Sequence, residues 1–273
     1  MEQLSLFPTP ADPRPPITVT WNMHHGCTKH SAGCSHCYMF RRDESVGRDP
    51  TIVRKTQAFN LPVRRLRAGE HKGRYKIPAG SLIYTCFSSD FFHKDADVWR
   101  DELWTMMRER ADWTFFMITK RPERIAEHLP SDWNDGWDHV HIAVTCENQW
   151  AADKRLPVYL GLPLKHRSIM VEPMLSRVNL HSYLESGKIE SVSTGGESGP
   201  DARPCDYAWV LDLHCQCVEH GVGFSYHQTG ARLIRKGKEY NIPRELQHEQ
   251  AHKAHLDFDG IRLPAWDEPD TGE

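Results

Sequence analysis

Seven short hydrophobic runs recur along the chain, and each has the length of a β-strand. They cover Ile17–Trp21, Ser81–Cys86, Thr114–Thr119, His139–Thr145, Ser168–Val171, Ile189–Thr194 and Val222–Tyr226. Most are continuous apolar runs rather than alternating ones, which is typical of parallel strands buried on both faces. Helical patterns separate some of them. Asp97–Ala111 repeats apolar residues at helical spacing, and Asp206 is a candidate N-cap for a helix that stops at Gly221.

Strands that alternate with helical or irregular connections predict an α/β fold with a parallel sheet. We expect a TIM-barrel-like βα barrel, complete or partly open, and a doubly wound open sheet is the alternative. The barrel domain is predicted to span residues 17–255. The Pro-rich residues 1–16 and the acidic, Pro-containing residues 256–273 are expected to form a flexible arm and a tail.

Composition adds few constraints on function. The 273 residues are 39% hydrophobic, enough for a substantial core, and the net charge of −3 favours no class of partner. No apolar stretch has the length of a membrane span, and the N-terminus lacks a basic segment followed by an apolar one. We therefore predict a cytoplasmic protein without a membrane partner. Its eight cysteines are expected to be thiols or ligands rather than disulfides.

Polar and charged residues follow the predicted strands repeatedly. In a parallel βα architecture these positions converge on the carboxyl-end face of the sheet, where ligands bind. In chain order they are Cys27, Cys34 and Cys37; Ser88, Ser89 and Asp90; Lys120 and Arg121; Glu147 and Asn148; Glu172; Gly195, Gly196 and Glu197; and His227 and Gln228.

The three cysteines in GCTKHSAGCSHCY lie within eleven residues. Three thiolates on one loop can hold a metal ion or an iron–sulfur cluster and leave one coordination position open, as a reactive site requires. The same spacing also fits a structural Cys3His zinc site that uses His24, His25, His30 or His36.

Several segments together resemble a known family. WNMHHGCTKHSAGCSHCY, ITKRPER, CENQ, VEPML and GGESGPDARP occur in this order between about Ile17 and Arg232. They look like the phage-protein family with a three-cysteine motif and a radical S-adenosylmethionine-like domain, whose reaction is largely unknown. A phage origin would place the protein in the host cytoplasm.

The resemblance implies a cofactor chemistry. Cys27, Cys34 and Cys37 would ligate three irons of a [4Fe–4S] cluster, and the fourth iron would bind S-adenosylmethionine. Reductive cleavage would yield a 5′-deoxyadenosyl radical that abstracts a hydrogen atom, with a flavodoxin- or ferredoxin-type protein as the electron donor. The spacing CxxxxxxCxxC departs from the CxxxCxxC of most such enzymes.

The resemblance also suggests roles for other residues. Gly195, Gly196 and Glu197 resemble an element that receives the methionine amino group, although that element usually follows the second strand rather than the sixth. Cofactor binding is further predicted for Ser89, Asp90, Lys120, Arg121 and Glu147, and catalysis for Glu172 and His227. Each charged residue can instead have a purely structural role, either as an ion-pair partner or as a hydrogen-bonded histidine at the barrel rim.

Residues 54–76 hold eight cations against one acid, together with Phe59 and Tyr75. Such a run either binds a nucleotide or nucleic acid, the substrate class we expect, or forms a solvated connection. Two other functions remain open: a zinc-dependent nucleic-acid-binding or hydrolytic protein, and a non-catalytic partner subunit that carries a cluster. Cys215 and Cys217 are predicted to point to different faces of a helix and not to bind a second cluster.

Overall fold

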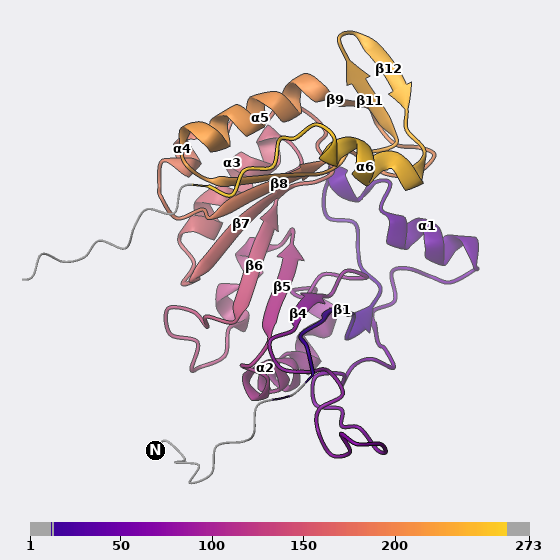
Figure 1. Ribbon diagram of the computed structural model, residues 1–273, viewed down its shortest axis with the longest axis vertical. Helices are drawn as coiled ribbons and strands as arrows, with labels where there is room; N and C mark the ends of the chain where they lie inside the picture. The colour runs from indigo at the N-terminus through magenta and orange to yellow at the C-terminus, as the bar shows by residue number, and fades with distance from the viewer. Residues whose placement is uncertain (1–11, 13, 261–273) are drawn as a thin grey trace, which may run out of the picture.

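A computed structural model describes residue 12 and residues 14–260 of the chain (Figure 1). Its centre is a curled sheet of seven strands in the order β1-β4-β5-β6-β7-β8-β10, with parallel pairing throughout. These strands are β1 (Thr18–Trp21), β4 (Leu82–Thr85), β5 (Thr114–Thr119), β6 (Val140–Thr145), β7 (His166–Val171), β8 (Ser191–Gly195) and β10 (Gly223–Gln228). All seven predicted strands are confirmed, to within a few residues at their ends.

The sheet is a half-barrel. Its strands follow one another in chain order, so the reversal of strand order that defines a doubly wound sheet does not occur. Strands β1 and β10 form the two edges and do not pair with each other. The prediction of a partly open barrel is therefore confirmed, and that of a closed barrel is wrong.

Six α-helices and five short strands complete the described chain. The helices are α1 (Tyr38–Ser45), α2 (Arg100–Glu109), α3 (Gln149–Leu160), α4 (His181–Leu184), α5 (Tyr207–Glu219) and α6 (Gln247–His252). The short strands are β2 (His24–His25), β3 (Arg54–Lys55), β9 (Cys205–Asp206), β11 (Arg232–Arg235) and β12 (Lys238–Asn241). The predicted cap of α5 is confirmed, because the Asp206 side chain accepts a hydrogen bond from the Ala208 amide at 2.9 Å. The helical pattern at 97–111 is divided between a 3-10 turn that ends at Trp99 and α2.

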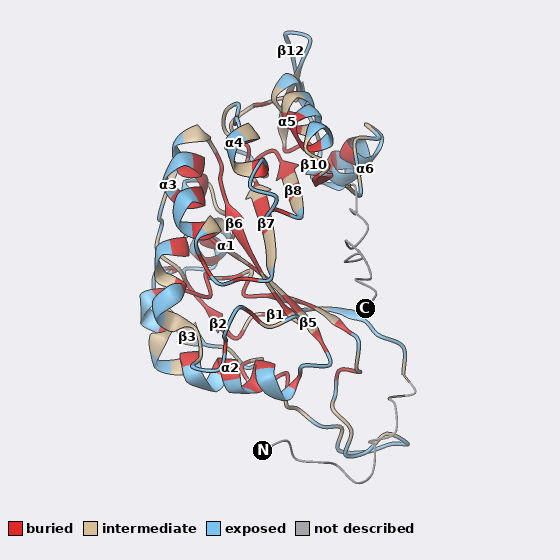
Figure 2. Cartoon of the chain, turned by 90° about the vertical axis from the view of Figure 1, so that its left-hand side faces the viewer, coloured by how far each residue is buried: buried red, intermediate tan, exposed pale blue. Residues whose placement is uncertain are grey.

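The core lies between the sheet and the helices that cover one of its faces. Helix α3 packs on β6, and α5 packs on β8 and β10. Alternate strand residues such as Ile83, Phe115 and Val192 are fully buried, and Figure 2 shows buried stretches along the strands of the sheet. Burial therefore alternates along several strands, as in β5. The other strand side chains face a cavity in the open side of the half-barrel. For these side chains the expectation that the strands are buried on both faces is wrong.

The predicted arm and tail lie partly outside the described residues, which omit 1–11, 13 and 261–273. Within the arm, the Arg14 guanidinium donates to the Tyr75 carbonyl at 2.7 Å. Within the tail, Phe224 and Phe258 exchange backbone hydrogen bonds of 2.7 and 2.9 Å. Residues 256–260 thus pack along the free edge of β10. No described helix is long and apolar enough to cross a membrane.

Candidate active site

The polar residues that follow the strands converge on one cavity, of about 730 Å³, at the carboxyl ends of the strands and along the open face of the sheet. Its wall contains all of the predicted site residues except Glu147 and Gly195. The predicted residues in the wall are Cys27, Cys34, Cys37, Ser89, Asp90, Lys120, Arg121, Glu172, Gly196, Glu197 and His227. The parallel topology accounts for this convergence, since each connection leaves its strand at the same edge.

The loop that carries the three cysteines runs from β2 to α1. Cys27 is fixed by its amide, which donates to the Pro50 carbonyl at 2.9 Å. Cys34 closes a short 3-10 turn, and Cys37 directly precedes α1. Gly26 is required at the start of the loop: its φ is +97°, and a Cβ there would lie 2.2 Å from the Ile52 carbonyl oxygen. The three thiols are free and half-buried.

The distances between the three cysteine sulfurs can be compared with those that a single zinc ion requires. Tetrahedral zinc with Zn–S bonds of about 2.3 Å brings its sulfurs to about 3.8 Å from one another. In the described chain, a group of three candidate ligand atoms that all lie within 4.8 Å of one another occurs at His141, His166 and Glu190, and the cysteines do not form such a group. At least one pair of the three cysteine sulfurs therefore lies more than 4.8 Å apart in the metal-free chain. A cluster attaches each cysteine to a different iron and suits separated sulfurs.

Three of the four histidines considered as a fourth zinc ligand have other contacts. His24 is fully buried, with Nε2 3.5 Å from the Cys86 sulfur. His25 pairs with the buried carboxylate of Asp43 at 2.6 Å, and His36 lies 3.1 Å from the Glu197 carboxylate. Only His30, which is exposed, has no such contact among the described residues.

The close His141, His166 and Glu190 group lies toward the amino ends of β6, β7 and β8. The two imidazole rings stack with centroids 3.9 Å apart and planes inclined by 4°, and His166 hydrogen-bonds Glu190 at 2.9 Å. Because the ring planes are parallel, one ion cannot lie in both planes, as good imidazole ligation requires. The group is best described as a stacked pair supported by a carboxylate.

A buried ion pair anchors the first part of the cysteine loop. The Arg121 guanidinium lies 3.1 Å from the Asp90 carboxylate and donates to the Thr28 carbonyl at 3.0 Å. Asp90 also accepts hydrogen bonds from the Thr119 hydroxyl at 2.8 Å and from the backbone. Burial raises the pKa of Asp90, but Arg121 and these hydrogen bonds outweigh burial and hold the pKa below its usual value. Arg121 and Asp90 thus position Thr28 and its neighbour Cys27.

Burial also affects the first cysteine. It raises the pKa of the Cys27 thiol to about 12, with a further contribution from the Asp90 carboxylate. Without a metal, Cys27 is therefore protonated at neutral pH, and its ligation of a metal would release a proton.

Glu147 lies beneath the cysteine loop instead of in the cavity wall. Its carboxylate is fully buried, accepts a hydrogen bond from the Gly33 amide at 3.2 Å and pairs with Arg155 at 2.6 Å. This arrangement makes Glu147 a positioning residue for the turn that leads to Cys34.

The GGESG segment brings the loops after β8 and β10 together. A Cβ on Gly196 would lie 2.3 Å from the Thr229 carbonyl oxygen, so only glycine permits this approach. The Glu197 carboxylate accepts from Arg203 at 2.6 and 2.9 Å and lies 3.1 Å from His36 Nδ1. The chain itself thus engages both oxygens of Glu197. Gly195 packs against Glu172 and Gln228 instead of lining the cavity.

The two predicted catalytic residues are in contact. His227 Nδ1 lies 3.0 Å from a Glu172 oxygen, and Gln228 donates to the same carboxylate. The hydrogen bond that the His227 imidazole donates to the Glu172 carboxylate raises the pKa of His227. The pair can hold a proton inside the cavity at a pH where an isolated imidazole would release it.

The two sides of the cavity differ in chemistry. Strands β4 and β5 and the loop after β4 contribute Tyr84, Phe87 and Phe116, with Tyr84 centroids 5.3 and 5.9 Å from the other two rings. Strands β7, β8 and β10 contribute four hydroxyl groups, from Ser168, Ser191, Ser193 and Ser225. The cavity thus offers a planar molecule one aromatic wall and one wall of hydrogen-bonding groups.

Sequence reasoning missed several cavity residues. Arg244 and His248 reach the mouth from the segment before α6 and from α6 itself, and Tyr38 reaches it from α1. Arg244 and His248 follow no strand of the central sheet, so the strand-end argument could not find them. Cys86, Cys146, Cys205 and Cys217 are buried, whereas Cys215 is exposed, which confirms that Cys215 and Cys217 point to different faces of α5.

Comparison with known proteins gives a family and one structural likeness. No curated protein matches the chain. A solved structure titled "Spore photoproduct lyase complexed with dinucleoside spore photoproduct" is similar with a TM-score of 0.41 and 12% sequence identity, over 87% of this chain and 71% of that chain. A family model matches residues 17–265, which is most of the chain. The chain therefore belongs to the family described as protein of unknown function DUF5131.

Proposed function

We propose that this protein is a radical S-adenosylmethionine enzyme whose cluster is held by Cys27, Cys34 and Cys37. The observation that carries the proposal is the convergence of these three cysteines on one cavity of about 730 Å³ at the carboxyl ends of a half-barrel. Three thiol ligands would leave one coordination position of a bound cluster unfilled.

The bound group would supply the redox chemistry. A reduced [4Fe–4S] cluster with S-adenosylmethionine provides a 5′-deoxyadenosyl radical that can remove a hydrogen atom from a substrate, with electrons from a flavodoxin- or ferredoxin-type donor. The protein would hold the reactants and exclude water. Arg121 and Glu147 fix the cysteine loop from two sides.

We assign the carboxylate of S-adenosylmethionine to Lys120, which directly precedes Arg121, the residue that holds the cysteine loop. Lys120 lies in the cavity wall, and its ammonium forms no ion pair with the other described residues. Arg121, by contrast, is already paired with Asp90. Glu197 is likewise already paired with Arg203. The Glu172 and His227 pair supplies a proton donor or acceptor next to the substrate.

The cavity walls support a nucleotide as the substrate class. A nucleobase is planar and carries polar edges, which matches an aromatic wall opposite a row of serine hydroxyls.

The test measures three properties of one anaerobically purified sample: its metal content, its sulfide content and its reductive cleavage of S-adenosylmethionine. We expect about four irons per chain and reductive release of 5′-deoxyadenosine. The Cys27→Ala/Cys34→Ala/Cys37→Ala variant should lose both, whereas Cys215→Ala, which alters an exposed cysteine on α5, should lose neither.

Two outcomes would overturn the proposal. Stoichiometric zinc, with no cluster after reconstitution with iron and sulfide, would establish a zinc protein. Iron without cleavage of S-adenosylmethionine would establish a non-catalytic subunit with a structural cluster.

A further inference from the structure

A basic β-hairpin is joined at its base to the loop that carries Glu197 in the cavity wall. Strands β11 and β12 pair antiparallel from Arg232 opposite Asn241 to Arg235 opposite Lys238. The turn residues Lys236 and Gly237 both have positive φ, 52° and 73°, as a tight two-residue hairpin turn requires. The hairpin projects from the domain (Figure 1), and all four residues of β12 are exposed. Pairing of β11 with β9 ties its base to the domain.

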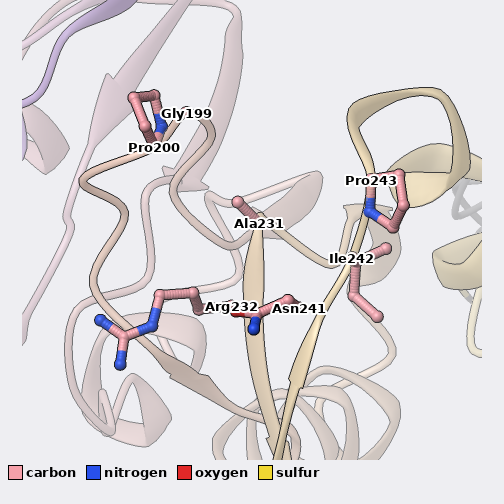
Figure 3. Close-up of a pocket in the computed structure, with 7 residues that line it drawn as sticks. All are labelled: Gly199, Pro200, Ala231, Arg232, Asn241, Ile242 and Pro243. Atoms are coloured by element: carbon pink, nitrogen blue, oxygen red, sulfur yellow. The ribbon is translucent and has the colours of Figure 1, made fainter.

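The base of the hairpin is joined to the loop that carries Glu197. The Ala231 amide donates to the Glu197 carbonyl at 2.9 Å, and the Ile242 amide donates to the Ala231 carbonyl at 2.8 Å. Figure 3 shows the hollow at this base, of about 310 Å³, between Gly199 and Pro200 on one side and the two hairpin strands on the other. Arg244, which lines the main cavity, follows β12 by three residues.

The charge of the hairpin is largely uncompensated. Arg232 pairs with Glu239 at 2.6 Å, and this is the acidic residue of the hairpin. Arg235, Lys236 and Lys238 form no ion pair with the described residues. Three cations thus remain available on a segment that protrudes into solvent.

Aromatic rings accompany these cations. The Lys238 ammonium lies 5.0 Å from the centroid of Tyr240, and the Arg235 guanidinium lies 5.2 Å from the centroid of Tyr207. Tyr240 is 40% exposed. Cations that meet phosphates and aromatic faces on which bases stack are the two components of single-strand nucleic-acid binding.

We propose that the β11–β12 hairpin binds a single-stranded nucleic acid and presents one of its nucleotides to the cavity. Arg235, Lys236 and Lys238 contact phosphates, and Tyr240 stacks on a base. The fate of the nucleotide rests on the proposed function, whereas the binding of the strand does not. DNA and RNA share the phosphates and bases that this surface would recognise.

The longer basic run at 54–76 is poorly placed for this task. The loop that carries most of this run lies at the end of the molecule opposite the hairpin (Figures 1 and 2). Several of its cations are engaged locally: Lys55 pairs with Glu102 at 2.9 Å, and Arg65 donates to the Gly73 carbonyl at 3.0 Å. Its exposed residues Arg67, Lys72 and Lys76 therefore provide a matched control for the hairpin.

The experiment measures fluorescence anisotropy of a labelled 20-nucleotide single-stranded DNA, with the same sequence as RNA in a parallel series, against salt concentration. Arg235→Ala/Lys236→Ala/Lys238→Ala should lose affinity on the order of tenfold or more, and the slope of log affinity against log salt should fall by about 2, since each phosphate contact on a single strand contributes about 0.7. The oligonucleotide that binds the wild type more tightly and loses more affinity in the triple variant shows whether the strand is DNA or RNA.

The control triple Arg67→Ala/Lys72→Ala/Lys76→Ala removes the same charge and should change affinity less than about twofold. Tyr240→Ala should weaken binding by roughly 5- to 100-fold, while Tyr240→Phe retains it, because stacking needs the ring and not the hydroxyl. Equal losses in the two triple variants, or unchanged binding by the hairpin triple, would overturn the proposal.

Failure of this proposal can be separated from failure of the proposed function. The hairpin triple should keep the iron content of the wild type, which also shows that it folds. The triple cysteine variant should lose iron and still bind the oligonucleotide. Binding that disappears with the cysteines and persists without the hairpin cations would contradict the hairpin proposal alone.

Discussion

Replacing Arg121 by methionine tests whether the buried ion pair with Asp90 supports the cysteine loop. The two side chains are only 8% and 7% exposed, and the nitrogen–oxygen distance is 3.1 Å. Methionine fills a similar volume without charge. It leaves the Asp90 carboxylate buried with its remaining neutral hydrogen-bond donors and releases Thr28 from the guanidinium.

The expected loss of stability follows from the uncompensated charge. Removing one partner of a buried pair costs about 3–5 kcal/mol, because the remaining charge keeps its desolvation penalty. Solvent that reaches the cavity wall relieves part of this penalty, so we expect about 3 kcal/mol for Arg121→Met. That is a large fraction of the roughly 5–15 kcal/mol by which a domain is stable.

The pH dependence of this loss has a definite sign. In the wild type the pKa of Asp90 lies below its usual value, so its contribution to stability is present above the unfolded pKa and decreases as pH falls through the folded pKa. Without Arg121, burial dominates and raises the pKa of Asp90. The folded variant then gains stability when the carboxyl becomes protonated. The cost of Arg121→Met should therefore be larger at pH 8 than near pH 5.

The assay is urea denaturation of the metal-free protein at both pH values. The double variant Asp90→Asn/Arg121→Met removes the stranded charge and should be more stable than Arg121→Met alone by about 1–3 kcal/mol. A cost below about 1 kcal/mol at pH 8, or a cost that does not depend on pH, would show that the Arg121–Asp90 pair does not carry this stability. Iron content measured on the same variant reports whether Thr28 and the cysteine loop have lost their anchor.

Three further substitutions test other parts of the structure. Glu172→Gln should lower the pKa of His227, which Glu172 now raises, and an NMR titration of the imidazole would show an unchanged pKa if the contact were absent. Burial lowers the pKa of His24 to about 3. The wild type should therefore lose stability as pH falls from about 6.5 toward 3, by up to about 1.4 kcal/mol per pH unit. In urea denaturation, the free energy of unfolding of His24→Gln should depend less steeply on pH. Gly26→Ala should cost roughly 3 kcal/mol in the same assay, because its Cβ meets a backbone oxygen at a positive φ, whereas Gly47→Ala has open space and should cost clearly less.

Sequence alone predicted the strands of the half-barrel but not which strand faces are buried. Thr114–Thr119 is a continuous apolar run, yet Phe116 and Ile118 line the cavity rather than the core. An aromatic binding wall and a buried core have the same hydrophobic signature, so the run could not show that one face is open. The polar Ser168 and Ser191 gave a weak sign of the open face, because such residues are disfavoured in a tightly packed interior.

The strand-end rule located the candidate site but could not assign partners within it. Parallel strands bring Asp90 and Arg121 to one edge, and adjacent strand ends make their contact foreseeable. The pairing of Glu197 with Arg203 depends on the conformation of an irregular loop, which no periodicity encodes. Glu147 follows a strand as expected, but its side chain turns beneath the cysteine loop to Gly33.

Placement also decides which basic segment can serve the cavity. The run at 54–76 has more cations than the hairpin and is the stronger signal in the sequence. A screened charge acts over about 10 Å at ordinary salt, so cations at the far end of the molecule contribute little to holding a strand at the mouth. The three hairpin cations, which have no ion pair within residues 14–260, stand on a segment bonded to the Glu197 loop, and Arg244 continues the same chain into the cavity wall. A short charged segment joined to the cavity wall can therefore outweigh a longer one elsewhere, and the two triple-alanine variants measure that difference directly.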